Sequence, residues 1–219
     1  MKIAILAHTL FPICEPYAGG MEMITHLLVK QLSERKHQVD LYAVSGSDPS
    51  LSIVRYAAKN DTQGGVTGSN DAQEDTSERF ECYQLAEAML KISIGDYDVV
   101  HNNTQHYLPV LLGEKLKTPF ITTFHIPAFE FLQYAFSYIP RQYNQTFTAV
   151  SGHLSTVYER LGIHSRVVYN GVDLNFWEYS NEASENALVW FGRICPEKGT
   201  HQAINVAKKM NLKLYLAGP

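Results

Sequence analysis

Two cations, Arg193 and Lys198, lie five residues apart in the segment GRICPEKG at residues 192–199. An apolar run precedes this segment and an amphipathic run follows it, so we expect a turn from a strand to a helix. A guanidinium and an ammonium group at a helix N-terminus can bind a diphosphate and stabilise it as it departs. On spacing alone, a solvated basic turn explains the same residues and is the more frequent case.

A glycine pair, Gly19-Gly20, stands between the first apolar run and the first helical pattern. Glycines let backbone amides come close to a ligand at the positively polarised start of a helix. The pair is not part of a GxGxxG fingerprint, and the loop from His8 to Gly20 is long for a dinucleotide turn. These features argue against a simple NAD-binding protein, and a turn without a ligand is the plainer interpretation.

His101 and His125 each stand at the end of an apolar run. Groups at the carboxyl ends of strands contact ligands in open α/β sheets, so both histidines are candidates for a cleft. His106 follows His101 after five residues without a nearby Cys or carboxylate. This spacing does not match a metal site, and we predict none.

Short apolar or β-branched runs alternate with longer amphipathic runs, a pattern that predicts an α/β fold with a parallel sheet wrapped by helices. Seven runs in the first 170 residues read as strands: 2–7, 38–44, 53–58, 97–102, 120–124, 146–150 and 166–169. Two more strands are expected at 187–192 and 212–217, with a helix at 199–210 between them. The first run is interrupted at His8 and Thr9, so a buried strand explains it better than a signal peptide.

Three further helices are predicted from apolar residues at helical spacing. The first presents one face to the sheet through Met21, Ile24, Leu28 and Leu32. The second, at 78–93, has in register Phe80, Tyr83, Ala86 and Leu90. The third covers 152–161 after the N-cap Ser151. Residues 60–77 are polar and rich in glycine, and we expect a mobile surface loop there.

Between residues 129 and 143, six of fifteen residues are aromatic: Phe129, Phe131, Tyr134, Phe136, Tyr138 and Tyr143. At helical spacing such a stripe is more often core than binding surface, so we expect most of these rings to be buried. If Phe129 and Tyr134 line a cleft instead, their rings could stack on a flat or apolar ligand. Arg141 is the only cation here, so we expect no membrane association.

The chain of 219 residues is 45% hydrophobic and 18% charged, with a net charge of −4. This composition provides enough apolar residues for a core. The negative net charge gives no positive electrostatic potential that would attract nucleic acid, which we exclude as a partner. The scattered cysteines Cys14, Cys82 and Cys195 favour reduced structural thiols and a cytoplasmic protein.

The composition changes at residues 170–186, where the segment becomes polar and ends in residues with short side chains, as expected of a connection between domains. We place the two domains at 1–176 and 177–219. A single βαβ unit cannot cover both faces of its own sheet, so the second domain is expected to be incomplete.

Three segments in this order carry a family resemblance: PYAGGME at 16–22, NGVD at 170–173 and GRICPEKG at 192–199. Together they resemble the retaining glycosyltransferases of family 4, which have the GT-B fold. The resemblance spans the first domain and the opening βαβ unit of the second. It implies two Rossmann-like domains across a cleft, the first mostly binding the acceptor and the second the nucleotide sugar.

The resemblance also implies roles for single residues. Arg193 and Lys198 match the pair that grips the donor diphosphate, and the Gly19-Gly20 pair matches the loop that approaches the same phosphates. His125 matches the active-site histidine, which would orient the reacting sugar and acceptor, and His101 would help to shape the same cleft. Enzymes of this kind need no bound metal and no cofactor besides the nucleotide-sugar donor.

The chain departs from the family pattern after Ala217-Gly218-Pro219. The family's Glu-x7-Glu element, whose acidic residues contact the donor sugar and ribose, lies beyond such a strand end. We therefore expect a chain truncated within the second domain, with little or no transferase activity by itself.

The leading hypothesis is a retaining hexosyltransferase that moves a sugar from a nucleotide diphosphate donor, UDP-glucose or a close relative, to an acceptor hydroxyl. One alternative is a non-catalytic binding or assembly module whose uncovered βαβ edge is completed by a partner chain, as in a homodimer. Another is a GT-B epimerase of sugar nucleotides, which the segment GRICPEKG fits less well.

Overall fold

The computed structural model describes the chain except for residues 58–72, 141–144, 178, 183–185 and 219. Its contacts divide the chain into two compact units, Met1–Gly171 and Val172–Pro219. The functional domain boundary expected after residue 176 stays a prediction.

The first unit is built on a sheet of seven strands in the order β3-β2-β1-β4-β5-β6-β7, and every neighbouring pair is parallel. The strands are β1 (Lys2–Leu6), β2 (Gln38–Ala43), β3 (Ile53–Arg55), β4 (Val99–Asn102), β5 (Phe120–Phe124), β6 (Gln145–Ala149) and β7 (Arg166–Val167). The strand order reverses between β1 and β4, which is where open parallel sheets bind ligands. The parallel α/β fold predicted from the sequence is confirmed.

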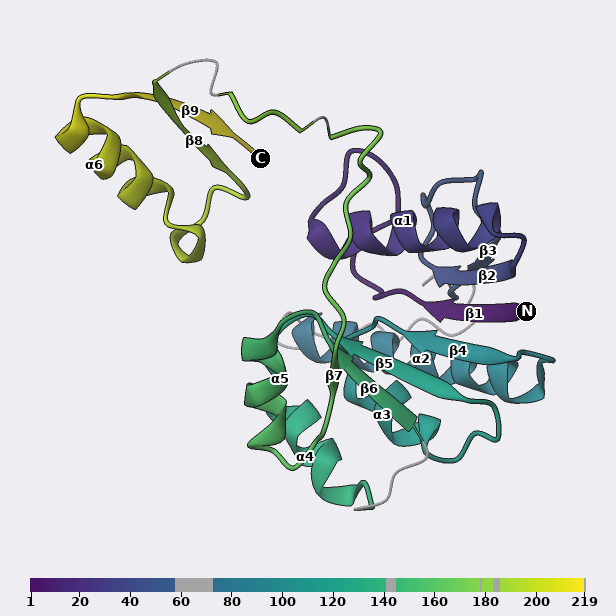
Figure 1. The fold of residues 1–219 in the computed structure, drawn as a ribbon. Coiled ribbons are helices and arrows are strands. Elements are labelled where there is room, and N and C mark those ends of the chain that lie inside the picture. Colours follow the sequence, from purple (N-terminus) through teal and green to yellow (C-terminus); the bar gives the residue numbers. More distant parts are fainter. Residues whose placement is uncertain (58–72, 141–144, 178, 183–185, 219) are drawn as a thin grey trace. The chain divides into compact units, whose positions relative to one another are not determined.

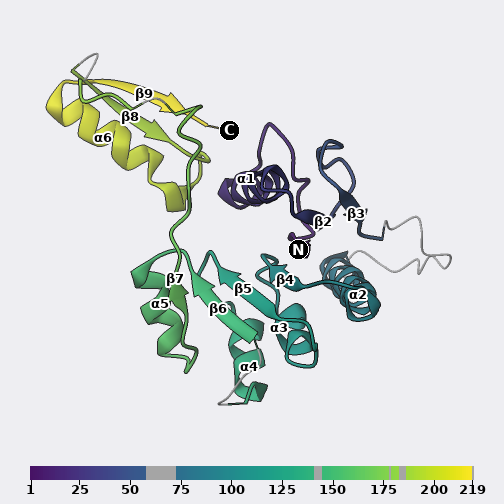
Figure 2. The ribbon, with the colours of Figure 1, turned by 45° about the vertical axis from the view of Figure 1, so that its right-hand side comes forward.

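The described helices of this unit lie on both faces of the sheet. They are α1 (Gly20–Glu34), α2 (Gln73–Ile94), α3 (Tyr107–Gly113), α4 (Glu130–Tyr138) and α5 (Gly152–Glu159). Figures 1 and 2 show α1 on one side of the sheet and α2, α3 and α4 on the other. In β1, Ile5 packs with Val29 of α1 and Leu6 packs with Leu85 of α2, the alternation of a strand buried on both faces.

A cluster of aromatic rings fills the core beneath β5 and β6. Phe124 stacks on Tyr158 and Phe147 with centroid distances of 3.6 and 5.4 Å, and Phe136 meets all three rings edge-on. The hydroxyl of Tyr158 donates to the carbonyl of Ile126 at 2.9 Å, so this buried polar group is paired. The cluster fixes α4 and α5 against β5, the strand that His125 follows.

Most of the aromatic stripe that was expected to be core is exposed. Four of its rings are more than half exposed: Phe129, Phe131, Tyr134 and Tyr138. The prediction was wrong because α4 is a short helix that turns one narrow face to the core, made of Leu132, Ala135 and Phe136. Tyr143 lies outside the described residues.

The buried face of α2 also differs from the predicted one. Tyr83 and Leu90, from the predicted stripe, are exposed. The buried apolar residues among those described in α2 are Leu85, Ala88, Met89 and Ile92. These four follow the spacing i, i+3, i+4, i+7, and they form the packed face because they belong to one buried cluster with Leu6 of β1.

The ends of two helices bear on the sequence predictions. Helix α2 begins at Gln73, so the last part of the predicted loop, 73–77, is helical. The remaining part of the predicted loop, residues 60–72, lies outside the described residues. Ser151 caps α5 as predicted, because its hydroxyl accepts a hydrogen bond from the backbone N–H of Leu154 at 3.1 Å.

The second unit contains β8 (Ala187–Phe191), the 3-10 turn η3 (Pro196–Lys198), α6 (Thr200–Met210) and β9 (Lys213–Ala217). The two strands pair in parallel along their whole length, from Ala187 and Lys213 to Phe191 and Ala217. The predicted βαβ unit is therefore present. Among the described residues of this unit, only Thr200 and Ala207 are buried.

Candidate active site

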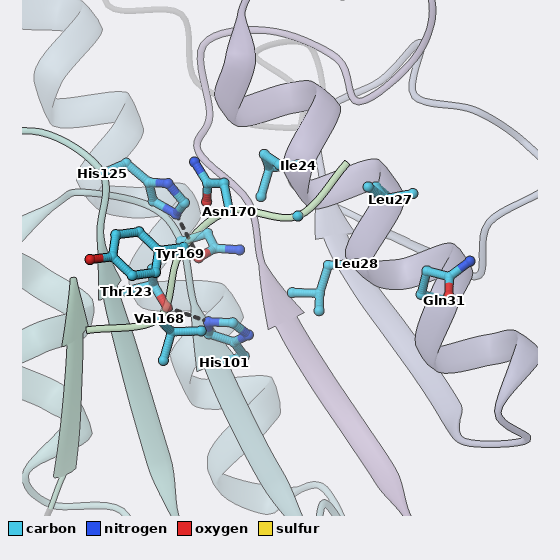
Figure 3. A pocket seen from close by; sticks show the side chains of 12 residues that line it. Ile24, Leu27, Leu28, Gln31, His101, Thr123, His125, Val168, Tyr169 and Asn170 are labelled. Atoms are coloured by element: carbon cyan, nitrogen blue, oxygen red, sulfur yellow. Dashed lines mark hydrogen bonds between the residues drawn. The ribbon is translucent and has the colours of Figure 1, made fainter. Parts of the chain in front are cut away.

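A cavity of about 240 Å³ lies in the first unit between α1 and the carboxyl ends of the central strands. Its lining comes from α1 (Ile24, Leu27, Leu28, Gln31), from β4, β5 and their ends (His101, Asn103, Thr123, His125) and from the segment after β7 (Val168, Tyr169, Asn170, Gly171). Figure 3 shows Leu28 pointing from α1 toward the strands that carry His101 and Thr123. The structure thus brings the two predicted histidines, His101 and His125, together in one cavity.

His101 is held by a chain of hydrogen bonds that crosses three strands. Its Nε2 lies 2.7 Å from Oγ1 of Thr123 in β5, which lies 2.8 Å from Oγ1 of Thr148 in β6. Burial lowers the pKa of His101 to about 4, and the neighbouring His125 adds to this effect. The imidazole is therefore neutral at pH 7.

His125 follows β5 directly and is held from two sides. Its backbone N–H donates to Oε1 of Gln105 at 3.0 Å, and its Nε2 lies 3.2 Å from Oδ1 of Asn103. Because an amide oxygen can only accept, Nε2 of the neutral ring carries the proton and Nδ1 is left as an acceptor. Burial lowers the pKa of His125 to about 4, so this neutral form persists at pH 7.

Gln105 joins the ends of β4 and β5. Its Nε2 donates to the carbonyl of Thr123 at 2.7 Å, while its Oε1 accepts from His125. The backbone of Gln105 has a φ of 60°, in the left-handed region that few residues other than glycine adopt. Such conformations persist where the surrounding contacts over-determine them, often at functional sites.

The glycine pair lies at the start of α1, as expected, but neither glycine lines the cavity. A Cβ on Gly20 would meet nothing within 4 Å, whereas a Cβ on Gly19 would come within 3.1 Å of Oε2 of Glu22. Glu22 is buried, and its Oε1 lies 2.7 Å from Nε2 of His8. His8 and Glu22 therefore tie the loop after β1 to the first turn of α1.

Phe129 and Tyr134, the predicted acceptor-cleft aromatics, are exposed and do not line the cavity. Their role in acceptor binding stays a prediction. His106 caps α3, because its Nδ1 accepts from the N–H of Leu108 at 3.1 Å. Within the part of the chain that the structure describes, no group of three or more His, Cys, Asp or Glu could hold a metal ion.

Arg193 and Lys198 are both exposed in the connection between β8 and α6. Trp190 anchors this connection by donating from Nε1 to the carbonyl of Lys198 at 3.1 Å. Gly199 has a φ of 67° and is the N-cap of α6, and a Cβ there would lie 2.8 Å from Oε1 of Gln202. Neither cation forms an ion pair with a described carboxylate. Both side chains are available at the amino end of a helix.

Residues 18–176 match the sequence model of Glycosyltransferase Family 4. The chain belongs to this family. No curated protein sequence matches it significantly. Among solved structures, sucrose-phosphate synthase from Thermosynechococcus elongatus matches with a TM-score of 0.64 at 15% sequence identity. The match covers 98% of this chain and 61% of that one, and it confirms the GT-B architecture expected from the sequence.

Three residues that organise the cavity of this family 4 chain were missed in the sequence: Asn103, Gln105 and Thr123. Asn103 and Thr123 stand at or next to strand ends, the same signal that singled out the histidines. The left-handed backbone of Gln105 has no signal in its residue type. In the described part of the chain, no helix is both long and apolar enough to cross a bilayer.

Proposed function

We propose that this protein is a retaining glycosyltransferase that moves a hexose from UDP-glucose or a close relative to an acceptor hydroxyl. The observation that carries the proposal is the exposure of Arg193 and Lys198 in the connection that leads into α6 in a family 4 chain. A nucleoside diphosphate has the charge that two cations and a helix N-terminus bind best.

In the proposed reaction, the bond between the anomeric carbon and the donor phosphate oxygen breaks, and its electron pair leaves with the nucleoside diphosphate. Arg193 and Lys198 stabilise the charge that develops there. The acceptor oxygen forms its bond to the anomeric carbon on the face that the phosphate leaves. The acceptor proton passes to the departing phosphate oxygen, and no metal or further cofactor takes part.

Same-face attack is taken from the family resemblance, because retaining enzymes of this type have no evident carboxylate nucleophile for a double displacement. None of the described residues that line the cavity beside His125 is Asp or Glu. His125, with Nδ1 free to accept a hydrogen bond, is assigned to orient the reacting hydroxyl and sugar.

UDP binding tests the diphosphate site in the chain itself. The family's Glu-x7-Glu donor contacts are not among the 219 residues, so we propose weak binding and little turnover for the chain alone. Titration with UDP should shift the amide resonances of residues 193–200, and Lys198→Ala should weaken binding roughly 10-fold or more, since hydrogen bonds to charged groups are strong. Lys208→Ala, in the last turn of α6, is the matched control and should bind as the natural chain does.

Turnover tests the reaction in the full-length protein. With UDP-glucose and an acceptor, Lys198→Ala should lower kcat/KM by about 10²-fold, and NMR of the product should show the anomeric configuration of the donor. Inversion of that configuration would contradict the proposed mechanism. Conversion of the donor sugar to its epimer without an acceptor would favour the epimerase instead.

A further inference from the structure

The cavity beside His125 has an apolar wall and a polar wall. Ile24, Leu27 and Leu28 of α1 supply the apolar wall. His101 and Thr123 face them from the strands, joined by their hydrogen bond (Figure 3). A ligand that fits such a site needs one apolar face and one face that forms hydrogen bonds.

No Lys, Arg, Asp or Glu is among the described residues that line this cavity. His101 and His125 add no positive charge at pH 7, because burial lowers the pKa of each to about 4. A phosphate monoester is a near-dianion, and entering the cavity would remove its hydration without supplying a cationic partner. The lining therefore favours an uncharged ligand.

Asn103 supplies a hydrogen-bond donor that nothing in the described residues uses. The residue is 2% exposed and lines the cavity, and its Nδ2 is buried without a hydrogen-bond partner among those residues. Its Oδ1 is already engaged by His125. An unpaired buried donor is costly, so an oxygen of a bound ligand that accepts from Nδ2 would remove this cost.

The cavity itself has room for about one ring. Its volume of about 240 Å³ exceeds the roughly 150 Å³ of an engineered cavity that holds benzene. A six-membered ring with hydroxyl substituents fits this range, whereas two linked rings would extend beyond it. A pyranose or a cyclic alcohol has the required combination of a hydrocarbon face and hydroxyl groups.

From these observations we infer that the cavity binds the acceptor as an uncharged, hydroxylated six-membered ring and discriminates against a phosphorylated ring. The hydrocarbon face packs on Leu27 and Leu28, and a ligand oxygen accepts from Nδ2 of Asn103. Use of this ligand as an acceptor rests on the proposed function. The binding preference is a property of the lining alone and can be measured without turnover.

A matched pair of probes, cyclohexanol and cyclohexyl phosphate, tests the charge preference of the cavity in the 219-residue chain. Methyl resonances of Ile24, Leu27 and Leu28 report on binding at the apolar wall. We expect cyclohexanol to shift all three in a saturable way and the phosphate to bind at least about 10-fold more weakly there. Equal or tighter binding of the phosphate, or no shift with either probe, overturns the inference.

Two variants locate the preference on named residues. Asn103→Leu removes the unpaired donor and should weaken cyclohexanol binding several-fold, with the amide spectrum showing that the fold is kept. Gln31→Lys adds a cation to the lining and should raise the affinity for cyclohexyl phosphate at least about 10-fold. Ser33→Lys adds the same charge on the exposed side of α1 and should change neither affinity. Unchanged affinities in both lining variants contradict the assignment.

The outcomes separate this inference from the proposed function. The 219-residue chain could bind cyclohexanol at α1 while the full-length protein transfers no sugar. This result would contradict the glycosyltransferase proposal and would leave the preference for an uncharged ring intact. Alternatively, the protein could transfer sugar to a phosphorylated ring and bind cyclohexyl phosphate at the methyl groups of Ile24, Leu27 and Leu28. This result would support the transferase proposal and contradict the inference about the uncharged ring.

Discussion

At the scale of single residues, the cavity depends on two buried imidazole rings, which are held by hydrogen bonds within the protein instead of by water. His101 is tied to Thr123, and His125 is tied to Asn103 and, through its backbone, to Gln105. Neutral rings satisfy these contacts, and burial makes protonation unfavourable. The same burial that prepares His125 to accept a hydrogen bond therefore makes the fold sensitive to acid.

Acid should destabilise the first unit through His101. The unfolded chain takes up a proton near pH 6.5, but the folded ring does so only near pH 4, so stability falls as the pH drops between these values. We expect the free energy of unfolding in urea to fall by about 2 kcal/mol between pH 7 and pH 5 on account of His101. His101→Gln should lack this contribution, and His153→Gln, which changes an exposed histidine of α5, should retain it. Equal losses in the natural chain and His101→Gln would show that His101 is not held neutral by burial.

At the scale of elements, runs of apolar residues predicted the strands and most of the helices, but they did not predict α3 or the buried face of α2. β1 and β5 were found because their apolar runs suit strands buried on both faces. Leu85 and Leu90 belong to two competing stripes of α2, and contact with Leu6 in β1 decides between them. That contact joins residues far apart in the chain, so local spacing does not reveal it.

The candidate site shows the same division between local and distant information. The positions of His101 and His125 at strand ends could be predicted, because a strand end is a local feature. The hydrogen bond from His125 to Asn103 joins residues 22 apart in sequence, and it depends on the pairing of β4 with β5. The unpaired side-chain amide of Asn103 therefore depends on the fold and could not be predicted from the residue type alone.

The face of α2 that packs on the sheet can be tested with two leucines of the same helix. Leu85→Ala removes a fully buried side chain from the core and should lower the free energy of unfolding by about 2–5 kcal/mol. Leu90→Ala changes a side chain that is 64% exposed and should cost about 0.5 kcal/mol or less. Urea unfolding followed by near-UV circular dichroism measures both. The reverse order would mean that the stripe expected from the sequence is the packed one.

At the scale of the whole molecule, the two units differ greatly in how much core they contain. The first has a seven-stranded sheet with three buried clusters, and the second has two strands and one helix around Thr200 and Ala207. Apolar side chains of β8 and β9 remain exposed, among them Val189 and Phe191. A unit as small as Val172–Pro219 buries too small a share of its surface to be more than marginally stable by itself. The proposed donor cations therefore lie in the less stable unit, and the cavity lies in the more stable one.

This difference predicts the pattern of amide hydrogen exchange in the 219-residue chain. Amides of β1 and β4 should exchange at least about 100-fold more slowly than those of β8 and β9, because the second unit opens at a lower free energy. Exchange at pH 7, followed by mass spectrometry of peptides, measures both sets in one sample. Equal protection that persists on dilution would contradict the prediction. Protection of β8 and β9 that is lost on dilution would show instead that a second copy of the chain covers the exposed strands, since binding to a partner depends on concentration.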